Sequence, residues 1–145
     1  MDLIELAEKP FMVAMLAAVE ACKHPVDEEG GIILAKEGEC VFVKVKNVYA
    51  GSDAAAGLYE TDQTELQEKV LTKVVDGWKF HASFHTHPQW MPNPSRLDME
   101  KLFQGFKHNV IFAPTTNMFS YTRWIDEKHS TYYIPKQTLE KLIKE

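Results

Sequence analysis

The residues that decide the fold are Phe84–Met99, FHTHPQWMPNPSRLDM, where a strand pattern runs into a proline-rich loop and then a helix start. His85 and His87 stand two residues apart on the expected strand. Side chains alternate between the faces of a strand, so these imidazoles share one face, with Cα atoms about 6.5 Å apart. Asp98 returns toward them in the first turn of a helix expected to begin near Ser95. Two imidazoles and a carboxylate leave a fourth tetrahedral position open, as catalytic zinc sites do.

Each of these residues also has a simpler interpretation. A lone His-x-His pair is often only packing, and Ser95 with Asp98 also fits a helix N-cap with an acid in the first turn. His81 has the strand parity of the two histidines, so it is either a neighbour of the site or an ordinary packed histidine. Trp90 and Met91 either contact a substrate or pin the loop, and the sequence leaves both open. The histidines at expected element ends are interpreted as solvated: His24, His108 and His129.

The rest of the chain predicts helices that flank a mixed sheet. Apolar residues with a helical period begin at Leu3, and Pro10 moves the expected start of the main helix to about Lys9. Pro135 is expected to open a terminal helix. The other expected elements are strands Gly31–Ala35, Cys40–Val48, Trp78–His87, Asn109–Ala113, Met118–Ile125 and Thr131–Ile134, and a helix from Asp62 or Thr64 to Asp76. This order predicts an α/β or α+β domain, and residues 1–145 are interpreted as one domain because no repeat or linker interrupts them.

The composition narrows the classes of function. The chain has 145 residues, 45% hydrophobic and 26% charged, as in an ordinary soluble protein. Its 16 basic and 21 acidic residues sum to a net charge of −5, which argues against a general nucleic-acid binder. The longest apolar run, Phe11–Val19, is far shorter than the roughly 20 residues of a membrane span. Two isolated cysteines, Cys22 and Cys40, favour a reducing compartment. We therefore expect a cytoplasmic protein with neither nucleic acid nor membrane as partner.

Taken together, the motif closely resembles the signature of the JAMM (MPN+) metalloprotease family, also called the JAB domain. HTHP is followed by six residues, a serine, two residues and an aspartate, which are Ser95 and Asp98. Upstream, DEEGGIIL is similar to the family's first strand, which carries a catalytic glutamate. The resemblance covers about residues 5–134, and the short chain is similar to small prokaryotic and phage members.

The resemblance implies an MPN/JAB-type mixed sheet flanked by helices, related to the cytidine-deaminase fold, and a role for each motif residue. His85, His87 and Asp98 would hold Zn²⁺, and Ser95 would donate a hydrogen bond to the oxyanion. The family's glutamate, a general base, stands three residues before a small residue that two apolar residues follow. Glu28 has that position relative to Gly31, which favours it over Glu29. Strand alternation leaves Thr86 on the opposite face, where its expected role is packing.

The function implied by the resemblance is zinc-dependent hydrolysis of a peptide or isopeptide bond. The family's best-known substrates are ubiquitin and ubiquitin-like proteins joined through their C termini to lysine, so the expected partner is a ubiquitin-like protein or its conjugate. One alternative is a phage-tail or cell-wall peptidase with the same zinc site. A second is a non-catalytic MPN scaffold, although family scaffolds usually lack the metal ligands that this chain retains. The sequence leaves the oligomeric state open.

Overall fold

The structure is a computed structural model, and it describes residues 8–48, 59–96, 98–99, 106–125 and 128–145. Two sequence-based expectations fall wholly or largely outside these residues: the apolar positions at 3–7 and most of the helix predicted near Ser95. No helix among the described residues is long and apolar enough to cross a membrane. The helices are α2 (Lys9–Ala21), α3 (Gln63–Val75) and α4 (Lys136–Ile143). The strands are β1 (Gly30–Lys36), β2 (Glu39–Val45), β3 (Lys79–Thr86), β4 (His108–Ala113), β5 (Met118–Ile125) and β6 (Lys128–Pro135).

The described strands form one mixed sheet in the order β2-β1-β3-β4-β5-β6. Only β3 and β4 pair in parallel, and all other neighbours are antiparallel. The predicted α+β class is confirmed, and so is the element order apart from the helix expected near Ser95, most of which lies outside the described residues. Two strand boundaries differ from expectation by more than one residue. β2 ends at Val45, because the chain then forms only an isolated bridge at Asn47, and β6 begins at Lys128 rather than Thr131.

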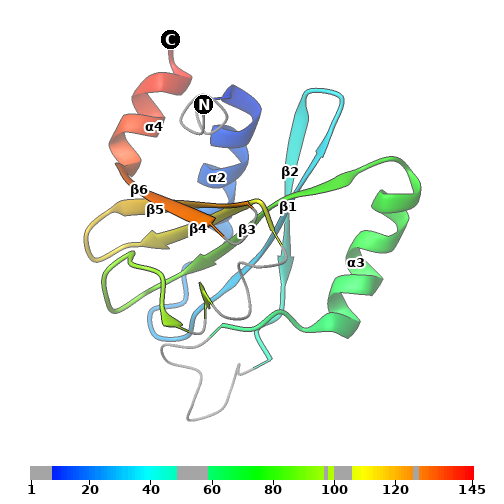
Figure 1. Cartoon of the computed structure of the whole chain (residues 1–145), viewed down its shortest axis with the longest axis horizontal. Coiled ribbons are helices and arrows are strands. Elements are labelled where there is room, and N and C mark those ends of the chain that lie inside the picture. The colour runs from blue at the N-terminus through cyan, green and yellow to red at the C-terminus, as the bar shows by residue number, and fades with distance from the viewer. Residues whose placement is uncertain (1–7, 49–58, 97, 100–105, 126–127) are drawn as a thin grey trace.

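Helices cover both faces of the sheet, α2 and α4 on one side and α3 on the other (Figure 1). Strand alternation produces this division, since Ile33 of β1 packs under α2 while its neighbours Ile32 and Leu34 pack under α3. α2 begins at Lys9 as predicted, with Pro10 in its first turn, where the missing N–H costs no hydrogen bond. The face under α3 is the face on which His85 lies, because the adjacent Phe84 belongs to the core under α2.

A β-bulge moves His81 away from the face predicted for it. The register between β1 and β3 shifts after Ile33, which pairs with Ala82, while Leu34 pairs with Phe80. His81 is the extra residue, and a bulge breaks the period-two alternation. Its ring packs edge-on against Phe11 of α2, with centroids 4.7 Å apart. His81 is therefore a packed histidine on the other face of the sheet, not a neighbour of His85.

The start of β1 lies unusually close to both neighbouring strands. A Cβ atom on Gly30 would stand 2.1 Å from the carbonyl oxygen of Phe84 in β3. A Cβ on Gly31 would stand 2.0 Å from the carbonyl oxygen of Val43 in β2. Side chains are excluded at both positions, so the two glycines let three backbones approach at the end of the sheet where His85 lies.

We expect Gly30→Ala to lower the free energy of unfolding by at least about 3 kcal/mol, because the new methyl group overlaps backbone atoms that cannot move aside. Gly38→Ala is the matched control. Gly38 has φ +82° and open space around it, so only conformational strain is added there, about 1–2 kcal/mol. Urea unfolding followed by circular dichroism measures both values. Equal losses in the two variants would contradict the close approach.

Candidate metal centre

Four acidic and imidazole side chains converge at one end of the sheet. Glu28 comes from the segment just before β1, His85 from β3 and His87 from the residue after it, and Asp98 from beyond the proline-rich loop. Each of the four residues is at most 1% exposed. The structure thus brings together the residues at which the motif places the metal ligands and the general base.

Distances separate the three ligand candidates from the glutamate. The Nε2 atoms of His85 and His87 are 3.2 Å apart, and Asp98 lies 3.1 Å from the first through Oδ1 and 3.3 Å from the second through Oδ2. Bonds of about 2.0–2.1 Å in a zinc tetrahedron place neighbouring ligand atoms about 3.3–3.4 Å apart, and each of these three separations is close to that value. Glu28 Oε1 is farther away, 3.8 and 4.0 Å from the same nitrogens.

Glu28, His85 and His87 also form a buried group whose ligand atoms lie within 4.8 Å of one another, and such a group could hold a metal ion. Asp98 lies closer to both imidazoles than Glu28 does, so its distances are compatible with a metal ligand and those of Glu28 with a place beside the ligands. Two imidazoles and one carboxylate are a donor set typical of catalytic zinc.

Ser95 and Asp98 bond to each other in the manner of a capping box. The Ser95 amide donates to Asp98 Oδ2 at 2.9 Å, and the Asp98 amide donates to Ser95 Oγ at 3.1 Å. The N-cap role and the ligand role of Asp98 are therefore compatible, because the cap with Ser95 orients the Asp98 carboxylate toward the imidazoles. The Ser95 hydroxyl accepts in this bond, so its own hydrogen remains a donor.

The structure separates Glu28 from Glu29. The Glu28 carboxylate points into the site, whereas Glu29 pairs with Lys44, Oε2 to Nζ 2.7 Å, and accepts from the His24 amide at 2.9 Å. Adjacent residues in extended backbone face opposite ways, which is why only one of them reaches the imidazoles. Glu28 is also held by its carbonyl oxygen, which accepts from Asn47 Nδ2 at 2.9 Å.

Thr86 does more than the packing predicted for it. Its Oγ1 accepts from the Glu29 amide at 3.1 Å, and its own amide donates to the Glu29 carbonyl at 2.8 Å. The strand pattern could not show this, because the partner lies 57 residues earlier in the chain. Through Glu29, Thr86 ties the segment that carries Glu28 to the strand that carries His85.

His108 is not solvated, contrary to the prediction from its place at an element end. It is the first residue of β4, is only 4% exposed, and its Nδ1 lies 2.6 Å from the hydroxyl oxygen of Tyr121. Its ring also lies 4.7 Å from that of the displaced His81. The neighbouring strand and α2 cover it, so a strand end need not be exposed.

Two aromatic rings support the two ligand histidines. Tyr59 stacks on His85 with ring centroids 5.4 Å apart, and Trp90 stacks on His87 with centroids 4.0 Å apart. The carbonyl of Met91 lies 2.9 Å from His87 Nδ1, so that nitrogen donates and Nε2 keeps the lone pair for a metal. Trp90 and Met91 therefore pin the loop to a ligand. No motif in the sequence marks Tyr59, since its contact with His85 is purely tertiary.

Burial and mutual attraction set the ionisation of the cluster. Burial raises the pKa of Glu28 to about 7, against the attraction of His85, and the charge of Asp98 adds to the rise. Burial also acts to raise the pKa of Asp98, but the charge and hydrogen bond of His85 hold it well below its usual range. Burial lowers the pKa of His87. Asp98 thus stays anionic, while Glu28 can accept and release a proton near neutral pH.

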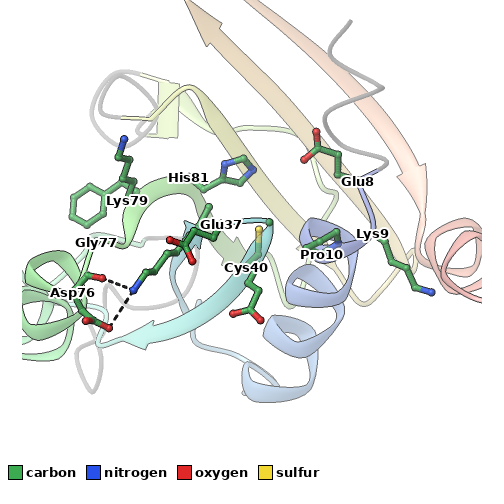
Figure 2. Close-up of a pocket in the computed structure, with 14 residues that line it drawn as sticks. Glu8, Lys9, Pro10, Glu37, Cys40, Asp76, Gly77, Lys79 and His81 are labelled. Atoms are coloured by element: carbon green, nitrogen blue, oxygen red, sulfur yellow. Dashed lines mark hydrogen bonds and ion pairs between the residues drawn. The ribbon is translucent and has the colours of Figure 1, made fainter.

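A hollow of about 940 Å³ lies at the end of β1 and β3 that is far from the buried cluster (Figure 2). It opens between the start of α2, the β1–β2 turn, the end of α3 and the start of β3. Its walls carry charges of both signs, including Lys36, which donates to Asp76 Oδ2 at 3.5 Å. Within the described residues, the close set of ligating side chains belongs to the buried cluster and not to this hollow, so we assign the chemistry to the cluster.

The fold and the cluster define an α+β domain with a buried group that could hold a metal. The family model for prokaryotic homologs of the JAB domain matches residues 11–125, and the chain belongs to this family. No curated protein matches the chain. Among solved structures, protein DSY2949 from Desulfitobacterium hafniense is similar, with a TM-score of 0.58, 18% identity, and coverage of 83% of this chain and 84% of that one. At that identity the likeness shows the fold alone. The JAB family predicted from the HTHP motif is confirmed.

We expect about one zinc ion per chain in protein purified without chelator, and a loss of metal affinity of more than about a hundredfold in Asp98→Asn. The amide keeps the shape of the carboxylate and can still accept from Ser95, but it lacks the charge. Asp76→Asn, far from the cluster, should keep its zinc. Elemental analysis and calorimetric titration measure both. Absence of zinc after reconstitution of the native chain would contradict the ligand set.

In chelator-treated protein, we expect Glu28→Gln to be more stable than the native chain at pH 8 and nearly equal to it at pH 5. Folding raises the pKa of Glu28 from 4.5 to about 7, so the native chain loses stability as the pH rises between these values. The gain should not exceed about 3 kcal/mol. Glu29→Gln is the control, and losing its ion pair with Lys44 should slightly destabilise the fold. Urea unfolding at both pH values tests the sign.

Proposed function

We propose that this chain is a zinc-dependent isopeptidase or peptidase that hydrolyses the bond after the C-terminus of a ubiquitin-like protein. The observation that carries the proposal is the buried triangle of His85, His87 and Asp98, with the Glu28 carboxylate just beyond it. Membership of the JAB family supports a metal-dependent hydrolase. The ubiquitin-like substrate rests on the resemblance of the motif to the JAMM proteases.

His85, His87 and Asp98 would hold the zinc ion, which when bound would polarise the scissile carbonyl as a Lewis acid and lower the pKa of a water molecule. Glu28 takes the proton of the attacking water and later returns it to the leaving amine. A carboxyl group with a pKa of about 7 suits both steps, because neither protonation state is strongly disfavoured at neutral pH. Ser95 donates its hydroxyl hydrogen to the oxyanion as the tetrahedral intermediate forms.

The proposed substrate could bind along an edge strand of the sheet. An extended C-terminal tail can add beside an edge strand, and β2 and β6 are the two edge strands of the described sheet.

Both cysteines, Cys22 and Cys40, are free, which favours a reducing compartment, and we propose the cytoplasm. Substrates joined to lysine by an isopeptide bond are compatible with an enzyme that acts in the cytoplasm.

The decisive experiment is a cleavage screen with zinc-loaded protein. The panel contains ubiquitin-like proteins fused through their C termini to a reporter, the same proteins joined to lysine, and cell-wall peptides. Cleavage after the C-terminus of a ubiquitin-like protein supports the proposal. Cleavage of the cell-wall peptides alone would indicate a phage-tail or cell-wall peptidase instead. Zinc binding without any cleavage would favour a non-catalytic MPN scaffold.

We expect Glu28→Gln to keep zinc and substrate binding and to lower turnover by about a hundredfold or more, because the general base is removed. Glu29→Gln should lower turnover only slightly, since its carboxylate faces Lys44 and not the ligands. Single-turnover cleavage with equal zinc loading measures the difference. The reverse order of the two variants would assign the base to the wrong residue.

A further inference from the structure

The Trp90 ring is held in one orientation at the wall of the metal centre. It stacks on His87 at 4.0 Å with an interplanar angle of 9°. The backbone carbonyl oxygen of Trp90 accepts from Thr115 Oγ1 at 3.0 Å, and the carbonyl of the next residue, Met91, lies 2.9 Å from His87 Nδ1. Both the ring and the backbone of this residue are therefore tied to the site.

Two polar atoms at this wall are buried without a hydrogen-bond partner among the described residues, Nε1 of Trp90 and Oε2 of Glu28. One is a donor and the other an acceptor, and both residues lie against His87: the Trp90 ring stacks on it, and Glu28 Oε1 lies 4.0 Å from its Nε2. Native proteins rarely leave a buried donor and a buried acceptor unpaired side by side.

The two oxygens of Glu28 have different surroundings. Oε1 lies 3.8 Å from His85 Nε2 and 4.0 Å from His87 Nε2, so it is the oxygen turned toward the ligands. Oε2 is the oxygen that has no hydrogen-bond partner among the described residues. Partial rotation about the terminal bond of the side chain would tilt the carboxylate plane and move Oε1 away from the imidazoles, so a donor on Oε2 would keep Oε1 in place.

We propose that Trp90 is a positioning residue whose indole N–H donates a hydrogen bond to Oε2 of Glu28 and thereby holds Oε1 toward the ligand histidines. The bond needs a small shift of the ring or the carboxylate, as is common when catalytic hydrogen bonds tighten on binding. The benefit of this bond to turnover rests on the proposed function, in which Glu28 is the general base, but the bond itself does not.

The first test needs no substrate. In the ¹⁵N spectrum of the zinc-loaded protein, the three indole N–H signals come from Trp78, Trp90 and Trp124. Glu28→Leu removes the acceptor at similar volume, whereas Glu28→Gln keeps an oxygen there. We expect the Trp90 signal alone to move upfield and exchange faster in the leucine variant, and much less in the glutamine variant. The proposal is overturned if Trp90 moves no more than the other two.

The second test removes only the N–H. Benzothienylalanine has the shape of tryptophan with sulfur in place of the N–H, and it is introduced at position 90, with Trp90→Phe as a second variant. Trp78→Phe and Trp124→Phe are the controls, since those rings pack on Lys73 and His129 instead. The probe is the fluorogenic C-terminal amide of ubiquitin or of whichever ubiquitin-like protein the screen selects.

We expect unchanged zinc content, a KM within about twofold and a kcat lower by about tenfold or more in both Trp90 variants. A packing role alone would predict normal kcat for benzothienylalanine, and that result would overturn the proposal. If no ubiquitin-like protein is cleaved at all, the proposed function fails, and the indole spectrum still decides whether Trp90 bonds to Glu28.

Discussion

The metal centre depends on the close antiparallel approach of the first residues of β1 to the last residues of β3. Gly30 pairs with His85, and its missing side chain lets the β1 backbone lie against the Phe84 carbonyl. Glu28, two residues earlier, is thereby carried to the imidazoles of the facing strand. Thr86 and Asn47 extend the same contact by bonding to the backbone of Glu29 and Glu28. Backbone contacts thus bring Glu28, the residue proposed as the base, to the two imidazoles proposed as metal ligands.

This arrangement buries two carboxylates and two imidazoles in the same small volume, which opposes stability in the absence of a cation. A buried charge is tolerated only where a partner compensates it. His85 and Asp98 compensate each other, since their pKa values move apart, and Glu28 is left with a raised pKa. The same burial that makes the site costly for folding makes Glu28 suitable for proton transfer at neutral pH.

Aromatic side chains at positions that the motif does not specify hold the two imidazoles in place. Tyr59 stacks on His85, and its hydroxyl donates to the Val45 carbonyl at 3.1 Å, while Trp90 stacks on His87. These rings restrict the rotation of the imidazoles, and the Met91 carbonyl selects the tautomer of His87.

The sequence by itself determined the features that depend on short-range spacing. The order of the described elements followed from periodicity, the shared face of His85 and His87 from alternation, and the cap between Ser95 and Asp98 from their spacing. The JAB family followed from the same motif. Tertiary structure alone decided the strand order, the parallel pairing of β3 with β4 and the bulge that displaces His81. The burial of His108 and the Thr86 bond to Glu29 were decided in the same way. The physical reason is range: alternation and capping act within a few residues, whereas pairing, bulges and stacking depend on segments brought together from distant parts of the chain.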